Sequence, residues 1–452
     1  MSGGLISEVA AGLVVPRPEG WEQLDAPADS VVLAHPPVPE GHFRPNLVLR
    51  RSESDSVSLP RLSTAALAGT LVLPGTHIIS NELWHQQLDP QGALVEGRQQ
   101  RFVRVAEGQV VCVDRWLFSD CGGSLEATAS YALEQHAGMR PLFEDMVFQM
   151  RRAAPVAAAP VAAAPAAAAP AAAGAPASPA GPEPRLDQAA SRLLQTAAED
   201  LAPLRAEQRH RVSGQIIAPE SLSLLLSMAN RDALGRFDAA GAGESAAQLQ
   251  ALGLLDGRRL TPSGRKFVQP LRGLQAQFTV SAVGPDGSTG MDAWLGAGSA
   301  LVAAGPSASG LQSTVMPLGS CELLCIDAAA LPVFLAKWLP LVPAWTAGQY
   351  PLRLSGDLFE RRLNGGSAVE APEGLGEAEA RMWAQPWVGW NVEHVHSGRK
   401  LGWVTAGDAG PFLATADPRN GGVALEPEPA AAVWDTLVNF ILAAAQGAFD
   451  PR

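Results

Sequence analysis

Two histidines and two cysteines are the side chains of this chain best suited to bind a metal ion. His394 and His396 are two residues apart on an expected strand, so both point to one face and Glu393 points to the other. A zinc site needs three or four ligands, and the remaining candidates are Cys321 and Cys325 at the end of another expected strand. This set does not make a complete ligand pattern. We interpret the histidines as ordinary residues beside a sheet, and we expect neither a metal nor a cofactor.

No short catalytic motif occurs in the sequence. The run Gly305-Pro306-Ser307-Ala308-Ser309 lacks the final glycine of the G-x-S-x-G nucleophile elbow. Gly296-Ala297-Gly298 lacks the third glycine of a dinucleotide-binding turn, and the sequence contains neither a P-loop nor H-E-x-x-H. Catalytic groups can also meet from distant positions, but nothing in the sequence favours an enzyme. We therefore expect no catalytic residues.

Tryptophans and arginines near residues 356–403 are the candidates for contact with another protein. Tryptophan offers a large contact area at low entropic cost, and arginine is also common at interfaces. If residues 387–395 form a strand, Trp387 and Trp390 lie on opposite faces, so at least one is expected to be exposed. Residues 356–380 are polar and long for a connector, which is typical of a binding loop. The alternatives are core packing and a solvated loop. The candidate partner-binding residues are Trp383, Trp387, Trp390, Trp403, Arg361 and Arg362.

The segment Leu249–Val268 is similar to the end of a winged-helix DNA-binding domain. Four basic residues at its end are suited to contact phosphates: Arg258, Arg259, Arg265 and Lys266. A complete helix-turn-helix should precede this segment, and residues 235–243 are too rich in glycine for a clean recognition helix. The net charge of −12 also disfavours nucleic acid as a partner. A transcription regulator is therefore the alternative function.

An alanine- and proline-rich run divides the chain of 452 residues. Residues 153–185 carry few charges and no large aromatic side chain, so they are expected to form a disordered, extended linker. We expect a first domain at 1–152 and a second at 186–452. No secretory signal and no uninterrupted apolar segment of membrane-spanning length is apparent, which favours a cytoplasmic protein without membrane insertion.

The first domain is expected to be α+β, an antiparallel sheet with a packed helix. Expected strands are 31–34, 46–50, 96–105, 109–118 and 125–133; the last alternates apolar and polar residues. A helix is expected from Arg140-Pro141 onwards, with an apolar face that includes Phe143 and Val147. The region resembles the PsbP-like domains of the LpqN/DcrB-related group, and the resemblance implies this fold and no catalysis. The residues that carry it are Pro18–Trp21, Phe43–Val48, Gly108 with Asp114–Trp116, and Leu142–Met146.

The second domain is also expected to be α+β and to have pseudo-twofold symmetry. Helical segments come first, at 186–201, 219–230, 246–255 and 263–271. Strands are then expected at 275–283, 291–295, 300–304, 311–316 and 322–326, followed by a helix at 328–339. A second block repeats the order, with strands at 387–395, 400–405, 412–415 and 423–425 and a helix at 430–446. Two blocks of strands followed by a helix predict an antiparallel sheet built from two related halves.

Residues 212–446 resemble the EspG family of type VII secretion chaperones. The residues that carry this resemblance are Leu249 with Gly253-Leu254-Leu255, Leu260-Thr261-Pro262, Leu271, Phe278-Thr279-Val280, Cys321–Leu324, Leu331–Leu339, Ser397–Val404, Asp408, Gly410-Pro411-Phe412 and Glu426-Pro427. The resemblance implies a cytosolic protein that holds a helical secreted substrate of the PE/PPE or WXG type. The fused first domain departs from the single-domain pattern of that family.

The combined expectation is a cytosolic adaptor or chaperone. The second domain would hold an apolar helical tip of the substrate in a groove. The first domain, on its tether, would add a second contact and raise the effective concentration. A small-ligand module that uses the sheet of the first domain is a further alternative.

Overall fold

The computed structural model describes residues 5–10, 13–27, 29–52, 57–89, 91–106, 108–120, 123–153, 184–235, 243–308, 316–317, 319–346, 348, 350–417 and 421–449. The expected linker at 153–185 falls almost wholly outside this part of the chain, as does most of the strand expected at 311–316. The chain divides into two compact units: unit 1 comprises 1–76, 82–106 and 111–203, and unit 2 comprises 77–81, 107–110 and 204–452.

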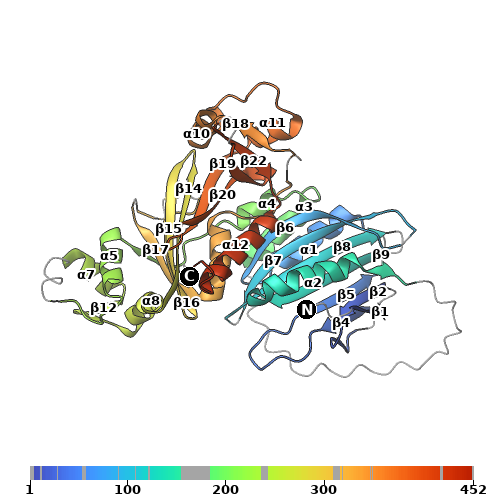
Figure 1. Ribbon diagram of the computed structural model, residues 1–452, viewed down its shortest axis with the longest axis horizontal. Coiled ribbons are helices and arrows are strands. Elements are labelled where there is room, and N and C mark those ends of the chain that lie inside the picture. Colours follow the sequence, from blue (N-terminus) through green and yellow to red (C-terminus); the bar gives the residue numbers. More distant parts are fainter. Residues whose placement is uncertain are drawn as a thin grey trace. The chain divides into compact units, whose positions relative to one another are not determined.

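The first unit is built on an antiparallel sheet of seven strands in the order β3-β4-β5-β9-β8-β7-β6 (Figure 1). These strands are β3 Glu22–Leu24, β4 Ser30–Ala34, β5 Asn46–Ser52, β6 Thr76–Gln86, β7 Val95–Ala106, β8 Gln109–Asp120 and β9 Gly123–Ala132. A smaller sheet joins β1 Leu5–Ala10, β2 Leu13–Pro18 and β10 Arg151–Arg152. The predicted alternation along β9 is confirmed, because Ala127, Ala129 and Tyr131 are buried while Glu126, Thr128 and Ser130 are partly exposed.

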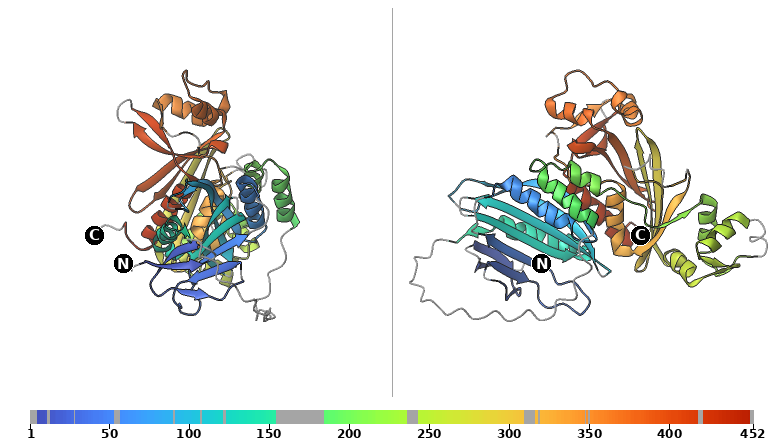
Figure 2. Two further views of the ribbon diagram at one scale, coloured as in Figure 1. Left: turned by 90° about the vertical axis from the view of Figure 1, so that its right-hand side faces the viewer. Right: turned by 180° about the vertical axis from the view of Figure 1, so that it is seen from behind.

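Helices cover both faces of this sheet. Helix α2, His136–Phe148, packs on the Tyr131 face through Phe143, whose ring centroid lies 5.9 Å from that of Tyr131. Helix α1, Leu59–Leu71, covers the other face, where Arg115 on β8 donates to the Ala66 carbonyl (Figures 1 and 2). The predicted α+β class is confirmed. Helix α2 begins at His136 rather than at Arg140-Pro141, after a short 3₁₀ turn (Leu133–Gln135).

A buried ionic network lies between the sheet and α2. Arg101 on β7 donates to Asp114 on β8, and both side chains are almost completely buried. The hydroxyl of Tyr131 donates to the other oxygen of Asp114 at 2.7 Å. Burial and then the neighbouring Asp114 charge raise the pKa of Tyr131 well above its ordinary value, so the phenol stays protonated.

Helix α3, Pro184–Gln195, packs against α1 in the first unit. Its buried side chains include Ala189, Ala190 and Leu193. The sequence analysis assigned this helix to the second domain, because it follows the alanine- and proline-rich run. The compact unit instead ends at residue 203, so this boundary differs from the expected one.

The second unit is built on one antiparallel sheet of ten strands in the order β11-β17-β16-β15-β14-β19-β20-β21-β22-β18. The strands are β11 Gln215–Ile217, β14 Leu274–Gly284, β15 Gly287–Gly296, β16 Ser299–Ala304, β17 Cys321–Asp327, β18 Leu352–Leu354, β19 Trp387–His394, β20 Arg399–Ala406, β21 Pro411–Asp417 and β22 Gly422–Pro427. Strands β12 Leu255–Asp256 and β13 Arg259–Leu260 form a separate hairpin.

The predicted pseudo-twofold arrangement is confirmed by this strand order. Strands β14 to β17 form one meander and β19 to β22 form the other, and the two first strands pair at the centre. A short edge strand pairs with the last strand of each meander, β11 with β17 and β18 with β22. Each half also ends in a helix, α9 Leu331–Trp338 in the first and α12 Ala430–Ala445 in the second.

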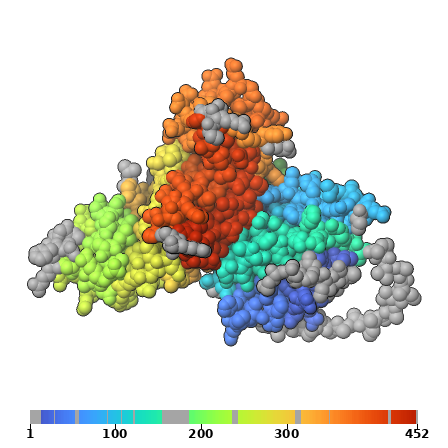
Figure 3. All heavy atoms as spheres, in the orientation of Figure 1, coloured from blue at the N-terminus to red at the C-terminus, as the bar shows by residue number. Residues whose placement is uncertain are grey.

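The two faces of this sheet are covered differently. Helices α9 and α12 pack together on one face, where the ring centroid of Phe440 on α12 lies 6.0 Å from that of Phe278 on β14. On the other face, each half carries its own helices, which project as two separate lobes (Figure 3). The first lobe consists of α5 Pro219–Ser227, α7 Gly243–Ala251 and α8 Pro262–Arg272, and the second of α10 Gly356–Gly365 and α11 Glu377–Ala384.

The second lobe corrects the expectation of a polar loop at 356–380. Ser355 caps α10, since its hydroxyl accepts a hydrogen bond from the Leu358 amide. The partly buried Leu358 and Leu363 pack toward the sheet from this helix. The polar residues of the segment form the outer face of an amphipathic helix, a pattern that composition alone did not separate from a loop. Among the residues that the structure describes, no helix is both long enough and apolar enough to cross a bilayer.

Candidate functional site

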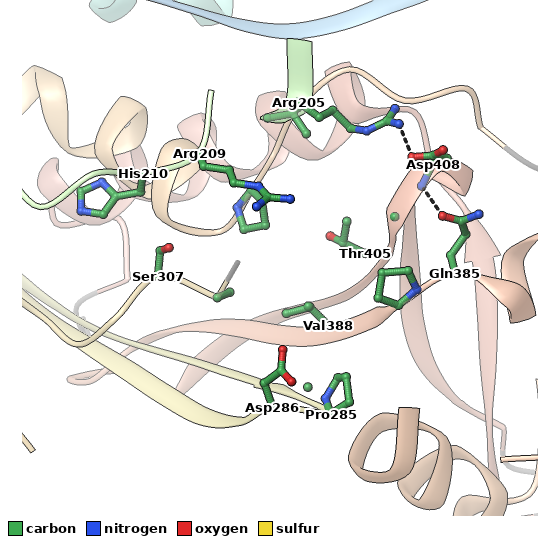
Figure 4. A pocket seen from close by; sticks show the side chains of 16 residues that line it. Arg205, Arg209, His210, Pro285, Asp286, Ser307, Gln385, Val388, Thr405 and Asp408 are labelled. Atoms are coloured by element: carbon green, nitrogen blue, oxygen red, sulfur yellow. Dashed lines mark hydrogen bonds and ion pairs between the residues drawn. The ribbon is translucent and has the colours of Figure 1, made fainter. Parts of the chain in front are cut away.

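A cavity with a volume of about 720 Å³ lies at one end of the central strands of the second unit (Figure 4). Its walls come from six parts of the chain: α4 (Ala202–Glu207) with the residues after it, the β14–β15 turn, the residues after β16, those after α9, the start of β19 and the end of β20. A cavity of this size is in the usual range for a small-molecule site.

Basic side chains form one wall of this cavity. Arg205 pairs with Asp408 and also donates to the carbonyl oxygen of Pro343 at 3.4 Å. Arg209 is exposed and extends into the cavity, with Asp286 on the opposite side (Figure 4). Arg209 makes no hydrogen bond or ion pair with any residue in the described ranges. The cavity therefore contains one arginine that pairs with a carboxylate, Arg205, and one that is available to a ligand, Arg209.

His210 continues this wall and is held by a buried carboxylate. Its Nε2 lies 2.7 Å from Oε2 of Glu322, which is fully buried on β17. The other oxygen of Glu322 accepts hydrogen bonds from the amides of Ser213 and Gly214, each at 2.6 Å. Burial alone would raise the pKa of Glu322, but these three hydrogen bonds outweigh it and bring the pKa below its ordinary value. Glu322 thus fixes the segment that carries Arg209 and His210.

The opposite wall is held by residues that the sequence analysis had assigned to partner binding. Arg362 is fully buried and donates to the carbonyls of Trp383 and Gln385, each at 2.6 Å. Its guanidinium lies over the rings of Trp383 and Trp387, at 5.3 and 4.8 Å from the centroids. Because Gln385 lines the cavity, Arg362 acts on the site by positioning its wall.

All four candidate tryptophans are buried, with at most 5% of each exposed. The expectation that Trp387 or Trp390 is exposed was wrong. Trp387 faces the α10–α11 lobe, and Trp390 packs against Trp403 on the other face, with ring centroids 4.7 Å apart and the rings tilted by 32°. Helices cover both faces of the sheet at this point, so opposite faces do not mean different exposure. Of the six candidates, only Arg361 is exposed, and a partner-binding role stays a prediction.

A second candidate surface is the middle of the same sheet, where the described helices leave side chains partly exposed. We call it the central strip and define it as Gln275, Gln277, Thr279 and Ser281 on β14 with Asn391 and Glu393 on β19; all six are at least partly exposed. Its side chains are polar; Asn391 donates a hydrogen bond to the Ser281 hydroxyl at 2.6 Å, and Thr279 donates one to Asp292 at 2.8 Å. Leu274 and Val395 add exposed apolar area at one end, with 48% and 43% of each accessible.

The histidines and cysteines considered as metal ligands do not come together. His394 is buried, and its Nδ1 lies 2.8 Å from the hydroxyl of Ser397. His396 is exposed, while Cys321 and Cys325 belong to β17, four strands away from β19. Within the described part of the chain, no three His, Cys, Asp or Glu side chains gather in a way that could hold a metal ion.

The segment Leu249–Val268 forms a helix, a hairpin and a second helix. The hairpin β12–β13 turns at Gly257, whose φ is +56°, and presents Arg258 and Arg259 to solvent. Arg272 donates to Asp232 beside it. This hydrogen bond, and the charges of Arg272, Arg265 and Arg259, lower the pKa of Asp232. Several arginines therefore gather on this lobe, but α7 itself contains no Lys or Arg.

The cavity residues Arg205, Arg209, Asp286 and Asp408 could not be grouped from the sequence. They come from segments up to about 200 residues apart, and no single motif contains more than one of them. One local signal was available: Pro285-Asp286-Gly287 is a typical turn between two alternating strands, and it places Asp286 at the tip of a hairpin.

Comparisons with family models and with curated proteins found no match. Among solved structures, PsbP from Synechocystis matches at 14% identity with a TM-score of 0.25, covering 33% of this chain and 93% of that one. LpqN from Mycobacterium tuberculosis, described as involved in cell envelope biogenesis, matches at 13% and 0.24, covering 31% and 83%. A protein from Bacteroides thetaiotaomicron matches at 11% and 0.25, covering 34% of this chain and half of that one.

PsbP and LpqN belong to the PsbP-like and LpqN-related proteins that residues 1–152 resemble in sequence. None of these three structures is described as a secretion chaperone. At such identities and TM-scores, the similarities carry no conclusion about function.

Replacing Arg362 by alanine should destabilise the second unit by about 3 kcal/mol, because two hydrogen bonds to backbone carbonyls and the packing under two tryptophans are lost. Arg361→Ala is the matched control, since Arg361 is exposed on the same helix; its effect should stay within about 0.5 kcal/mol. Urea unfolding followed by tryptophan fluorescence measures both. Equal effects of the two substitutions would contradict the positioning role of Arg362.

Glu322→Gln should lower the free energy of unfolding at pH 7 by about 2 kcal/mol. The folded-state pKa of Glu322 lies below its unfolded value, so its contribution is present above about pH 4.5 and is lost as pH falls through the folded pKa. The difference in the free energy of unfolding between wild type and variant should therefore shrink as the pH falls below about 5. Urea titrations at several pH values test this, with the exposed Glu220→Gln as control; a pH-independent difference would contradict it.

Proposed function

We propose that the chain is a cytoplasmic adaptor or chaperone that binds a helical substrate protein of a type VII secretion system, of the PE/PPE or WXG type. The resemblance of residues 212–446 to the EspG family suggests this class of partner. The observation that carries the proposal is the central strip, which no helix in the described part of the chain covers, although helical lobes cover both flanks of the same face.

The central strip is two strands wide, because it lies on the neighbouring strands β14 and β19, which are about 4.8 Å apart. A helix with its side chains is about 10–12 Å wide, so one helix of the substrate would contact both strands at once. The exposed Leu274 and Val395 would contact its apolar side chains, and the amides and hydroxyls of the strip would contact its polar ones.

The first unit has a supporting role in this proposal. It carries no catalytic motif, and the segment that joins it to the second unit has the composition of a spacer. If the tethered first unit contacts the same substrate, it raises the effective concentration of that substrate at the central strip, and the strip itself needs no further contacts.

Thr279→Lys should weaken substrate binding at least tenfold, because it places a long charged side chain in the middle of the strip. Ala416→Lys on β21 is the matched control, since it adds the same side chain at an exposed strand position outside the strip. Pull-down from the host identifies the substrate, and calorimetry with the purified substrate measures affinity. Recovery of no type VII substrate would refute the proposed function, whereas equal affinities of Thr279→Lys and wild type would refute only the strip.

A winged-helix-like regulator is the second candidate, and the hairpin β12–β13 with its exposed arginines favours it. We expect a double variant, Arg258→Gln with Arg259→Gln, to bind secretion substrate as wild type does. Fluorescence anisotropy with labelled genomic fragments at 50 and 200 mM salt tests the regulator directly. Sequence-specific binding that survives 200 mM salt and is lost in the double variant would favour the regulator over the adaptor.

A further inference from the structure

The cavity described above is separate from the central strip in its residues and in its chemistry. No residue of the strip lines it. Its volume of about 720 Å³ is large for a packing defect and suits a small organic molecule.

The charges of the cavity favour a ligand with one negative charge. Asp408 pairs with Arg205, whereas Arg209 makes no hydrogen bond or ion pair within the described ranges and is therefore available to a ligand. Asp286 and Asp408 would repel a ligand with several negative charges, such as a polyphosphate. The guanidinium presents paired N–H donors in the geometry that a carboxylate accepts.

The remaining walls define the rest of the ligand. Val342, Val388, Ala308 and several prolines give the cavity an apolar lining beside the arginine. Thr405 accepts a hydrogen bond from Nε1 of Trp390 at 3.0 Å, so its hydroxyl proton is free to point elsewhere. Apolar surface with a few fixed polar groups is typical of sites for amphipathic small molecules.

The walls are held before any ligand arrives. Glu322 fixes the Arg209 segment, Arg362 fixes Gln385, and Trp338 donates to the carbonyl oxygen of Gly305 at 3.0 Å beside Ser307. Preformed walls reduce the entropic cost of binding. We infer that this cavity binds a small amphipathic organic monocarboxylate, with its carboxylate on Arg209 and its apolar body against Val342 and Val388.

Fluorine NMR of the full chain tests this inference with 4-(trifluoromethyl)phenylacetate as the probe. The wild type should bind the acid with a Kd below about 5 mM, a modest affinity for so small a ligand. The uncharged amide of the same probe and plain acetate should each bind at least about tenfold more weakly, because one lacks the charge and the other lacks the apolar body.

Arg209→Gln should lose at least about tenfold in affinity for the acid, whereas Arg211→Gln should keep the affinity of wild type. Arg211 is the matched control because it is an exposed arginine two residues away that does not line the cavity. Thermal unfolding should be unchanged in both variants. Absence of acid binding, equal affinity for acid and amide, or equal effects of the two substitutions would each overturn the inference.

Discussion

The antiparallel pairing of β14 with β19 is the interaction on which the second unit depends. It joins the two meanders into one sheet and sets Phe278 beside His394 and Ala282 beside Trp390. Side chains alternate between faces along a strand, so a slip of one residue would move Phe278 away from α12 and bring Thr279 under it. The central strip requires this register, which the Asn391–Ser281 hydrogen bond supports. The Trp390–Trp403 pair depends on the neighbouring pairing of β19 with β20.

Large aromatic side chains and buried charges hold the walls of the cavity in place, although they do not line it themselves. Trp387, Trp390 and Arg362 lie in the core, yet each contacts residues at the wall of the cavity or next to it. Glu322 likewise holds the segment of Arg209 and His210 from within the core. Substitution of such residues would change a site through its geometry, because none of them is exposed to a ligand.

Local patterns were sufficient to predict many elements of the two units. The alternation along 125–133 and 275–283 corresponds to β9 and β14, and the apolar face at 433–441 corresponds to α12. The repeated order of strands and helix predicted the pseudo-twofold sheet. The segment at 356–380 was misread because α10 and α11 present polar faces to solvent, and helix α1 and strand β6 were not anticipated.

The α+β class, the position of most strands and the two-block order follow from the amino-acid pattern, because periodicity is a local property of the chain. Which residues share a site depends on the folding of distant segments onto one another. Arg209, Asp286 and Thr405 meet in one cavity, and α3 returns to pack on α1, through contacts between residues far apart in sequence. The exposure of a side chain also depends on the tertiary structure. Side chains alternate between the two faces of a sheet whether helices cover one face or both, so the surrounding helices determine whether a tryptophan is buried.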